Sequence, residues 1–160
     1  MFGKVIKIVG DTIYVQNLAG KAETGVLGYH VVFNDANRQI VGEIENIDAE
    51  SIEILLIGEI VNNIFIPGVI KKPNAEAGCR IITKRELEYI LGSQDYTKKN
   101  NVLIGDSLTY PGFKITADVN QLFANHFAVL GNTGSGKSCS VTRIIQNIFY
   151  YNDEVMPTNI

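Results

Sequence analysis

Residues 126–138 read His-Phe-Ala-Val-Leu-Gly-Asn-Thr-Gly-Ser-Gly-Lys-Ser. Within this stretch, residues 131–138 match the pattern G-x-x-x-x-G-K-[ST] of a phosphate-binding loop, or P-loop. Residues 126–130, four of them apolar, predict a short buried strand before the loop. Apolar residues after the loop recur at helical spacing: Val141, Ile144, Ile145, Ile148 and Phe149. Strand, glycine loop and helix in this order predict the opening unit of an α/β nucleotide-binding domain.

Each fixed position of the loop has a chemical purpose. Glycines let successive backbone amides point inward at phosphate oxygens. Lys137 would place a cation on the β- and γ-phosphates and is our candidate catalytic residue, while the Ser138 hydroxyl would bind Mg²⁺. We therefore expect ATP and Mg²⁺ as ligands. The expected nucleotide-binding residues are Gly131, Asn132, Thr133, Gly134, Ser135, Gly136, Lys137, Ser138 and Cys139.

The first 72 residues are rich in isoleucine and valine, and short apolar runs are separated by polar turns. Val5–Val15 reads as a hairpin about Gly10-Asp11. Further strands are expected at 29–33, 39–47, 52–57 and 59–66, with a turn at 34–37. Because closure removes exposed strand edges, these strands predict a small closed β-barrel over residues 1–72.

Residues 73–101 read as a connector with one short helix. Thr83 and Glu86 form a capping-box pattern, and Gly92 is suited to end the helix. The polar stretch 94–101 reads as a linker or exposed loop. Strand character returns at 102–105 and 113–115 around a turn at 110–112, so residues 102–160 are interpreted as the beginning of the nucleotide-binding domain.

Composition narrows the protein class. The chain has 160 residues, 46% of them hydrophobic, and a net charge of −3, which gives no support for a globally basic nucleic-acid binder. Two cysteines build neither a disulfide framework nor a zinc site. The longest uncharged apolar stretch, 60–70, is too short to span a membrane, since a span needs about 20 residues. We expect a cytoplasmic protein with no membrane partner.

Several other features have two interpretations. The acidic stretch 43–59 is either a solvated face of the barrel or a surface for a basic partner. His126 could sense phosphate or touch DNA, but a structural role is favoured. Packing is the favoured role of the Cys139 side chain, and core or interface packing that of Tyr150–Tyr151. Asp153 and Glu154 are interpreted as loop residues rather than a metal site.

Hydrolysis by a P-loop enzyme also needs an acidic residue at the end of a later strand. Only 22 residues follow Ser138, and none of them form an apolar run ending in Asp or Glu. We therefore expect the chain to stop inside its ATPase domain. We predict weak or no ATP turnover by residues 1–160 alone.

The predicted barrel followed by this loop signature resembles the HerA family of ATPases, within the HerA–FtsK group of RecA-like motors. The match to the family signature falls on His126, Gly131, Thr133, Gly134, Ser135, Gly136, Lys137 and Ser138. The resemblance spans the chain but covers only the first part of a HerA protein. It implies a mainly β, HAS-barrel-like N-terminal domain and the first strand–P-loop–helix unit of a RecA-like α/β domain.

By the same resemblance, the parent would be a hexameric, DNA-stimulated ATPase and translocase or helicase. Its barrel would dock a nuclease or a sirtuin-like effector, in DNA end processing or anti-phage defence, and double-stranded DNA would bind segments absent from this chain. Two alternatives stay open. The barrel and the nucleotide site could form a non-motor assembly platform, or the chain could be a rotary-ATPase-like subunit, although Thr-Gly-Ser-Gly-Lys-Ser points away from the latter.

Overall fold

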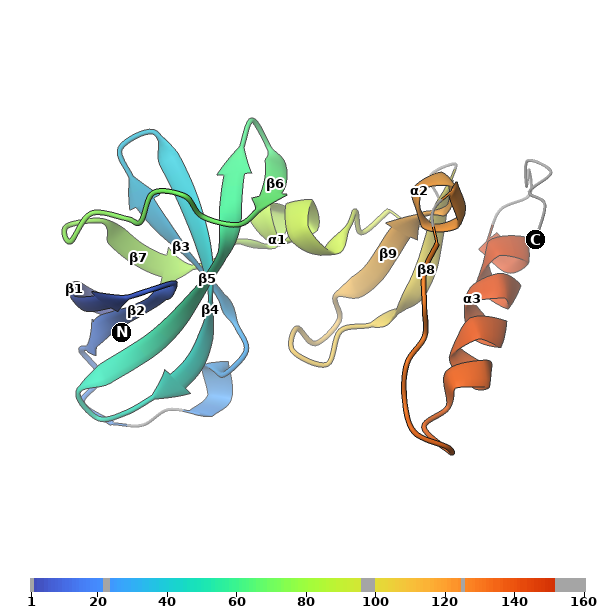
Figure 1. Ribbon diagram of the computed structural model, residues 1–160, viewed down its shortest axis with the longest axis horizontal. Helices are drawn as coiled ribbons and strands as arrows, with labels where there is room; N and C mark the ends of the chain where they lie inside the picture. Colours follow the sequence, from blue (N-terminus) through green and yellow to red (C-terminus); the bar gives the residue numbers. More distant parts are fainter. Residues whose placement is uncertain (1, 22–23, 96–99, 125, 152–160) are drawn as a thin grey trace. The chain divides into compact units, whose positions relative to one another are not determined.

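The computed structural model describes residues 2–21, 24–95, 100–124 and 126–151. These residues divide into two compact units, Met1–Ile90 and Leu91–Ile160. We call the first the half-barrel unit and the second the P-loop unit. Figure 1 shows the strands of the first unit gathered together, and a β-hairpin accompanied by helices in the second.

The half-barrel unit contains one antiparallel sheet of seven strands in the order β1-β2-β5-β4-β3-β7, with β6 pairing β5. Its elements are β1 Phe2–Val9, β2 Thr12–Asn17, the 3₁₀ helix η1 Thr24–Val26, β3 His30–Asp35, β4 Arg38–Ile47, β5 Ser51–Val61, β6 Ile64–Pro67, β7 Gly78–Ile81 and α1 Lys84–Leu91. Strand β5 is the centre of the sheet, since it pairs with β2, β4 and β6.

The core follows from the side-chain alternation of this central strand. From Ile52 to Ile60, every second residue of β5 is buried. These side chains pack against apolar residues from β2, β3 and β4, among them Ile13, Phe33 and Ile44. Strand β4 departs from simple alternation because two register shifts interrupt its pairing with β5. The outcome is one continuous core under a curved sheet.

The predicted closed barrel is wrong in one respect: the described strands form a half-barrel. Strands β1 and β7, at the two ends of the sheet, approach each other. However, no hydrogen-bonded register joins them within the described ranges. Two register shifts break the regular backbone spacing of β1, and β7 has only four residues, so neither presents a long ladder to the other.

Turn chemistry explains where the strand boundaries differ from those predicted. The hairpin about Gly10-Asp11 is confirmed, with Gly10 at a φ of 59°. The expected strand 59–66 is instead the end of β5, a turn and β6. The turn consists of Asn62 and Asn63, whose φ values of 51° and 64° are typical of a type I′ turn. Strand β7 lies in the predicted connector and pairs with β3, so the half-barrel unit continues past residue 72.

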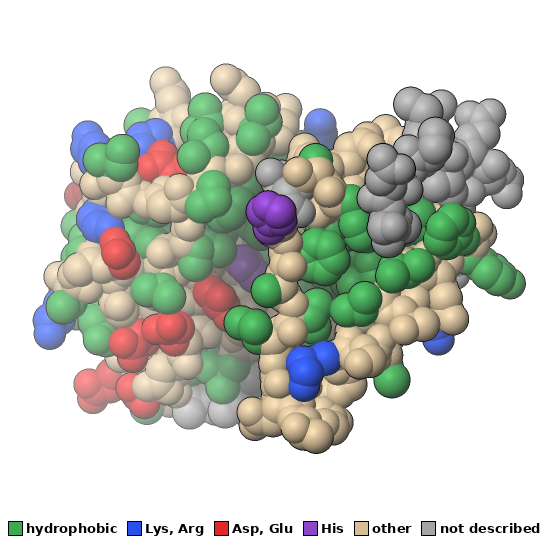
Figure 2. Space-filling view, turned by 45° about the vertical axis from the view of Figure 1, so that its right-hand side comes forward, with side chains coloured by type: hydrophobic (Ala, Val, Ile, Leu, Met, Phe, Trp, Pro, Cys, Tyr) green, Lys and Arg blue, Asp and Glu red, His purple; other side chains and the backbone are tan. Residues whose placement is uncertain are grey.

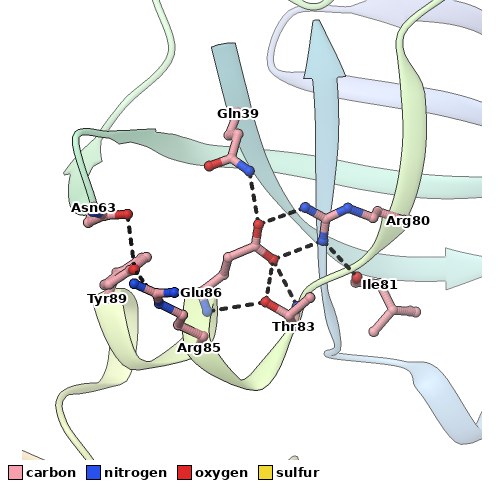
Figure 3. Close-up of polar contacts among 8 residues, drawn as sticks. All are labelled: Gln39, Asn63, Arg80, Ile81, Thr83, Arg85, Glu86 and Tyr89. Carbon is pink, nitrogen blue, oxygen red and sulfur yellow. Dashed lines mark hydrogen bonds and ion pairs between the residues drawn. The ribbon is translucent and has the colours of Figure 1, made fainter. Parts of the chain in front are cut away.

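One carboxylate joins the first turn of helix α1 to the half-barrel unit (Figure 3). The capping box is confirmed: Thr83 donates its backbone N–H to Glu86 Oε2 at 2.9 Å, and the Glu86 N–H donates to Thr83 Oγ1 at 3.3 Å. Arg80 donates to both oxygens of Glu86 at 2.6 and 2.8 Å. Gln39 from β4 donates to Oε1 at 2.9 Å. Glu86 therefore joins α1 to β4 and β7.

This network predicts a pH dependence of the stability of the half-barrel unit. The hydrogen bonds from Arg80 lower the pKa of Glu86 to about 2, well below the ordinary glutamate value. Because the folded pKa is depressed, the stabilisation is complete above about pH 5 and is lost as the pH falls toward 2. We expect Glu86→Gln to lower the free energy of unfolding at pH 7 by about 1–3 kcal/mol. Urea unfolding followed by circular dichroism would measure it.

The control is Glu88→Gln on the same helix, for which we expect a change within about 0.5 kcal/mol. Between pH 5 and 3, the wild-type chain should lose more stability than Glu86→Gln does. Equal pH dependence in the two proteins would contradict the assigned role of Glu86.

The P-loop unit is built on a β-hairpin. Its elements are β8 Asn101–Asp106, β9 Lys114–Asp118, α2 Val119–Ala124 and α3 Lys137–Tyr151. The predicted strands around the turn at 110–112 are confirmed, with Gly112 at a φ of 76°. Helix α2 was not predicted, although Asp118 caps it by accepting the Gln121 N–H at 2.9 Å. Buried Val102, Val119 and Ile148 form the core of this unit.

The strand predicted at 126–130 is not formed. These residues are exposed and extend from α2 to the loop without strand pairing. A strand needs a hydrogen-bonded neighbour, and β8 and β9 pair only with each other among the described strands. The predicted strand–loop–helix unit is thus represented here by its loop and its helix.

Candidate functional site

The loop at 131–136 adopts the turns that its glycines permit. Gly134 and Gly136 have φ values of 83° and 85°, in the region that side-chain-bearing residues avoid. The Ser135 N–H donates to Asn132 O at 3.1 Å and closes a tight turn. At Gly131, an added Cβ would overlap the Ser135 hydroxyl. The glycines therefore allow a compact loop that ends at the N-terminus of α3.

The Lys137 ammonium lies across the base of this loop. Its Nζ donates to Gly131 O at 2.8 Å and to Asn132 O at 2.6 Å. The sequence spacing places the lysine on the first residue of α3, so its side chain folds back over the preceding turn. A fixed positive charge at the loop is suited to an anionic ligand such as a phosphate group.

The N-terminus of α3 adds positive electrostatic potential at the same loop. The first N–H groups of a helix have no partner within it, and the helix dipole makes this end partly positive. Helix α3 has no acidic residue in its first turn. Ser138 lies exposed on that turn, one residue after the lysine. Backbone amides, ammonium and hydroxyl thus gather at one end of α3, a donor set that fits a phosphate with its bound Mg²⁺.

The rest of α3 is anchored by a residue that sequence reasoning missed. Asn147 is buried, and its Nδ2 donates to Leu103 O of β8 at 2.7 Å. The adjacent Ile148 packs into the core with Val102. A polar residue inside an apolar helix face was the available signal, because a buried amide needs a partner. The anchor fixes the helix that begins at the loop.

The other predicted residues lie at the surface. Cys139 is exposed, so the packing role favoured for it is wrong. Phe149 and Tyr150 are 61% and 83% exposed, so they are not in the core of the P-loop unit, because Ile148 and Asn147 face the hairpin instead. His126 is exposed in the extended segment before the loop. The Tyr151 side chain and residues 152–160, with Asp153 and Glu154, lie outside the described residues.

The acidic stretch of the half-barrel unit forms part of its surface. Figure 2 shows acidic side chains gathered on the face of the half-barrel unit in view. Glu45 and Glu50 are exposed, whereas Glu53 accepts a hydrogen bond from the Tyr14 hydroxyl at 3.1 Å. That bond raises the pKa of Tyr14. No group of three or more His, Cys, Asp or Glu residues in the described ranges is arranged to hold a metal ion.

The loop geometry gives a direct prediction for Gly136. An alanine there has free space, but its φ of 85° would be strained by about 1–2 kcal/mol. We expect Gly136→Ala to weaken nucleotide binding by roughly tenfold, since 1.4 kcal/mol is a factor of ten. Titration with a fluorescent ATP analogue would measure this. Gly105→Ala in β8, which also meets open space but has no positive φ, should bind as wild type; equal affinity of both variants would contradict the loop strain.

A family model matches the P-loop unit, and known proteins match most of the whole chain. A family model described as "Helicase HerA, central domain" matches residues 102–155. A probable DNA double-strand break repair helicase HerA of Methanocaldococcus jannaschii is 28% identical over 158 residues. A DNA double-strand break repair helicase HerA of Pyrococcus furiosus is 33% identical over 108 residues.

These alignments cover much of this chain but a minor part of the relatives. The first covers 95% of this chain and 30% of the M. jannaschii protein. The second covers 68% of this chain and 18% of the P. furiosus protein. No helix within the described ranges is long and apolar enough to cross a membrane.

Proposed function

Because this chain is homologous to the HerA-family helicases over most of its length, we propose that it is the N-terminal part of an ATP-dependent DNA translocase or helicase. The observation that carries the proposal is the loop at the start of α3, with Lys137 Nζ held at Gly131 O and Asn132 O. A loop that concentrates backbone donors and one ammonium at a helix N-terminus suits the phosphates of ATP.

The proposed roles divide among three groups of the loop. Backbone amides between Gly131 and Ser138 hold the phosphate oxygens, and the Lys137 ammonium stabilises the charge that develops on them. Among the described residues, the Ser138 hydroxyl is the protein ligand offered to Mg²⁺. When bound, Mg²⁺ neutralises charge on the β- and γ-phosphates. Asn132, Thr133, Ser135 and Cys139 line the same loop and the first turn of α3.

Residues 102–160 form, in this proposal, the beginning of a RecA-like ATPase domain. A hexamer would let one subunit complete the phosphate site of its neighbour. Double-stranded DNA would bind segments other than those described. The half-barrel unit would dock a nuclease or a sirtuin-like effector, in DNA end processing or in anti-phage defence, and the assembly would work in the cytoplasm.

The deciding experiment measures ATP hydrolysis by the full-length protein with and without double-stranded DNA. We expect hydrolysis that rises with DNA and is lost in Lys137→Ala. A full-length protein that binds an effector but does not hydrolyse ATP would instead support the platform alternative. Residues 1–160 alone should show weak or no turnover, because no apolar run ending in Asp or Glu follows the loop within them. Robust turnover by this chain would contradict that expectation.

A further inference from the structure

An apolar hollow of about 330 Å³ lies on the half-barrel unit, lined by β5, β6 and the segment that follows them. Val61 lies opposite Ile64 in the β5–β6 register, and Ile66 follows two residues later, so these three side chains share one face of the hairpin. They are 43%, 64% and 48% exposed, and Ile70, which lines the same hollow, is fully exposed. We call these four residues the hairpin patch. Single exposed apolar side chains are ordinary, but a group of them around a hollow is typical of a contact surface.

Exposed basic side chains border the hairpin patch. Lys71, the residue after the patch, is exposed. Arg85 of α1 is exposed beside the tip of the hairpin, because it donates to the Tyr89 hydroxyl, which in turn donates to the β5–β6 turn (Figure 3). The carboxylate of Glu59, which also lines the hollow, is already paired, since it accepts from Arg38 at 2.6 Å. The hairpin patch therefore combines apolar side chains with exposed positive charge.

The opposite end of β5 carries the opposite charge. Figure 1 shows β6 at one end of β5 and the β4–β5 turn at the other, and the 11 residues of β5 span roughly 35 Å. Glu45, Asp48 and Glu50 are exposed at or near this turn. The exposed Leu18 lies beside them, because the N–H of the preceding Asn17 donates to Glu50 O at 2.9 Å. We call these four exposed residues the acidic end.

The charge of the acidic end stays negative although one lysine lies near it. Lys21 is that lysine, since its backbone carbonyl accepts from the Asn17 side chain at 2.8 Å. Three exposed carboxylates therefore face one ammonium. In Figure 2, acidic side chains gather low on the half-barrel unit, with most of its basic side chains above them. The half-barrel unit thus carries an apolar surface with basic neighbours at one end and an acidic surface at the other.

We propose that the hairpin patch of one copy of this chain binds the acidic end of the half-barrel unit of a second copy. Charge complementarity selects this occupant, because the acidic end places carboxylates and an exposed leucine opposite basic and apolar side chains. The two surfaces differ, so the contact is head-to-tail, and each pair keeps one free surface of each kind. Further copies add until a ring closes. The use of this contact rests on the proposed hexamer, whereas the contact itself needs no nucleotide.

Sedimentation velocity of residues 1–160 over a range of concentrations tests the contact. We expect the average mass to rise with concentration past twice the mass of one chain. Ile70→Asp should raise the dissociation constant at least about tenfold, because it replaces an apolar contact by a carboxylate that repels the acidic end. The control is Leu108→Asp in the β8–β9 turn, where the side chain is equally exposed, and it should associate as wild type. Neither change should alter the circular dichroism spectrum.

Charge reversal identifies the two surfaces that meet. Lys71 and Glu50 have exposed side chains, and their bonds to the fold are made by backbone carbonyls, so both can be replaced without loss of those bonds. Lys71→Glu and Glu50→Lys should each weaken association about three- to tenfold. An equimolar mixture of the two variants should associate more tightly than either alone, because every contact between unlike copies again joins opposite charges.

Four results would overturn the inference. A wild-type chain that stays monomeric up to about 1 mM would assign the hairpin patch to a different partner. Growth that stops at two copies would mean a symmetric contact. Association of Ile70→Asp equal to that of wild type, or a mixture no tighter than its components, would mean that copies meet elsewhere. None of these measurements involves ATP hydrolysis, so a failure of the proposed motor function would appear only in the hydrolysis assay.

Discussion

Replacing Lys137 by alanine is expected to reduce ATP turnover of the full-length protein by about 10²–10³-fold, the loss typical of removing one charge-stabilising donor. Within residues 131–138, the ammonium is the single side-chain cation, and it is already positioned by Gly131 O and Asn132 O. Alanine also removes the bridge between the two ends of the loop. Steady-state hydrolysis and titration with a fluorescent ATP analogue would separate the loss of turnover from the loss of binding.

The control for this prediction is Lys114→Ala in β9 of the same unit. Lys114 forms an exposed ion pair with Asp106 at 3.1 Å, which is worth little to stability. ATP binding and turnover by the Lys114→Ala variant should equal those of the wild-type protein. If Lys137→Ala kept turnover within a factor of about three of wild type, against the expected 10²–10³-fold, the loop would not be the hydrolytic site.

The largest effect on stability is expected at Phe33. Its side chain is 0% exposed, on β3 between its pairing partners Ile40 of β4 and Cys79 of β7. Phe33→Ala should lower the free energy of unfolding of the half-barrel unit by about 3–5 kcal/mol, because the ring loses its burial and leaves a cavity. Urea unfolding of residues 1–160, followed by far-ultraviolet circular dichroism, would measure the change.

Ile64→Ala provides the comparison within the same sheet. Ile64 is 64% exposed on β6, so its truncation should change the free energy of unfolding by less than about 0.5 kcal/mol. A loss at Phe33 no larger than the loss at Ile64 would mean that the core is not centred on β3 and β5.

Local sequence chemistry predicted much of the half-barrel unit. Gly10 and the Thr83–Glu86 box act through neighbours within a few residues, so a turn and a helix start could be read directly. Strand pairing could not be read in this way. Strand β7 is a four-residue segment that forms only because β3 offers it an edge, more than 40 residues earlier in the chain. For the same reason, the sequence could not predict that β1 and β7 remain unpaired.

The candidate site likewise has a part that the sequence predicted and a part that it did not. Residues 131–138 identify the loop from sequence alone, because phosphate recognition depends on backbone conformations and one lysine within eight consecutive residues. The anchor from Asn147 to Leu103 spans 44 residues, and nothing local specifies it.

The sequence by itself therefore determined the glycine-rich loop at 131–136, the helix that follows it and the first hairpin, since each depends on short-range backbone preferences. Only the tertiary structure decided that the sheet is a half-barrel, that residues 126–130 stay unpaired and that α1 is attached to the half-barrel through Glu86. Those features depend on which distant backbone groups and side chains meet, and a hydrogen bond forms only where both of its partners are brought together.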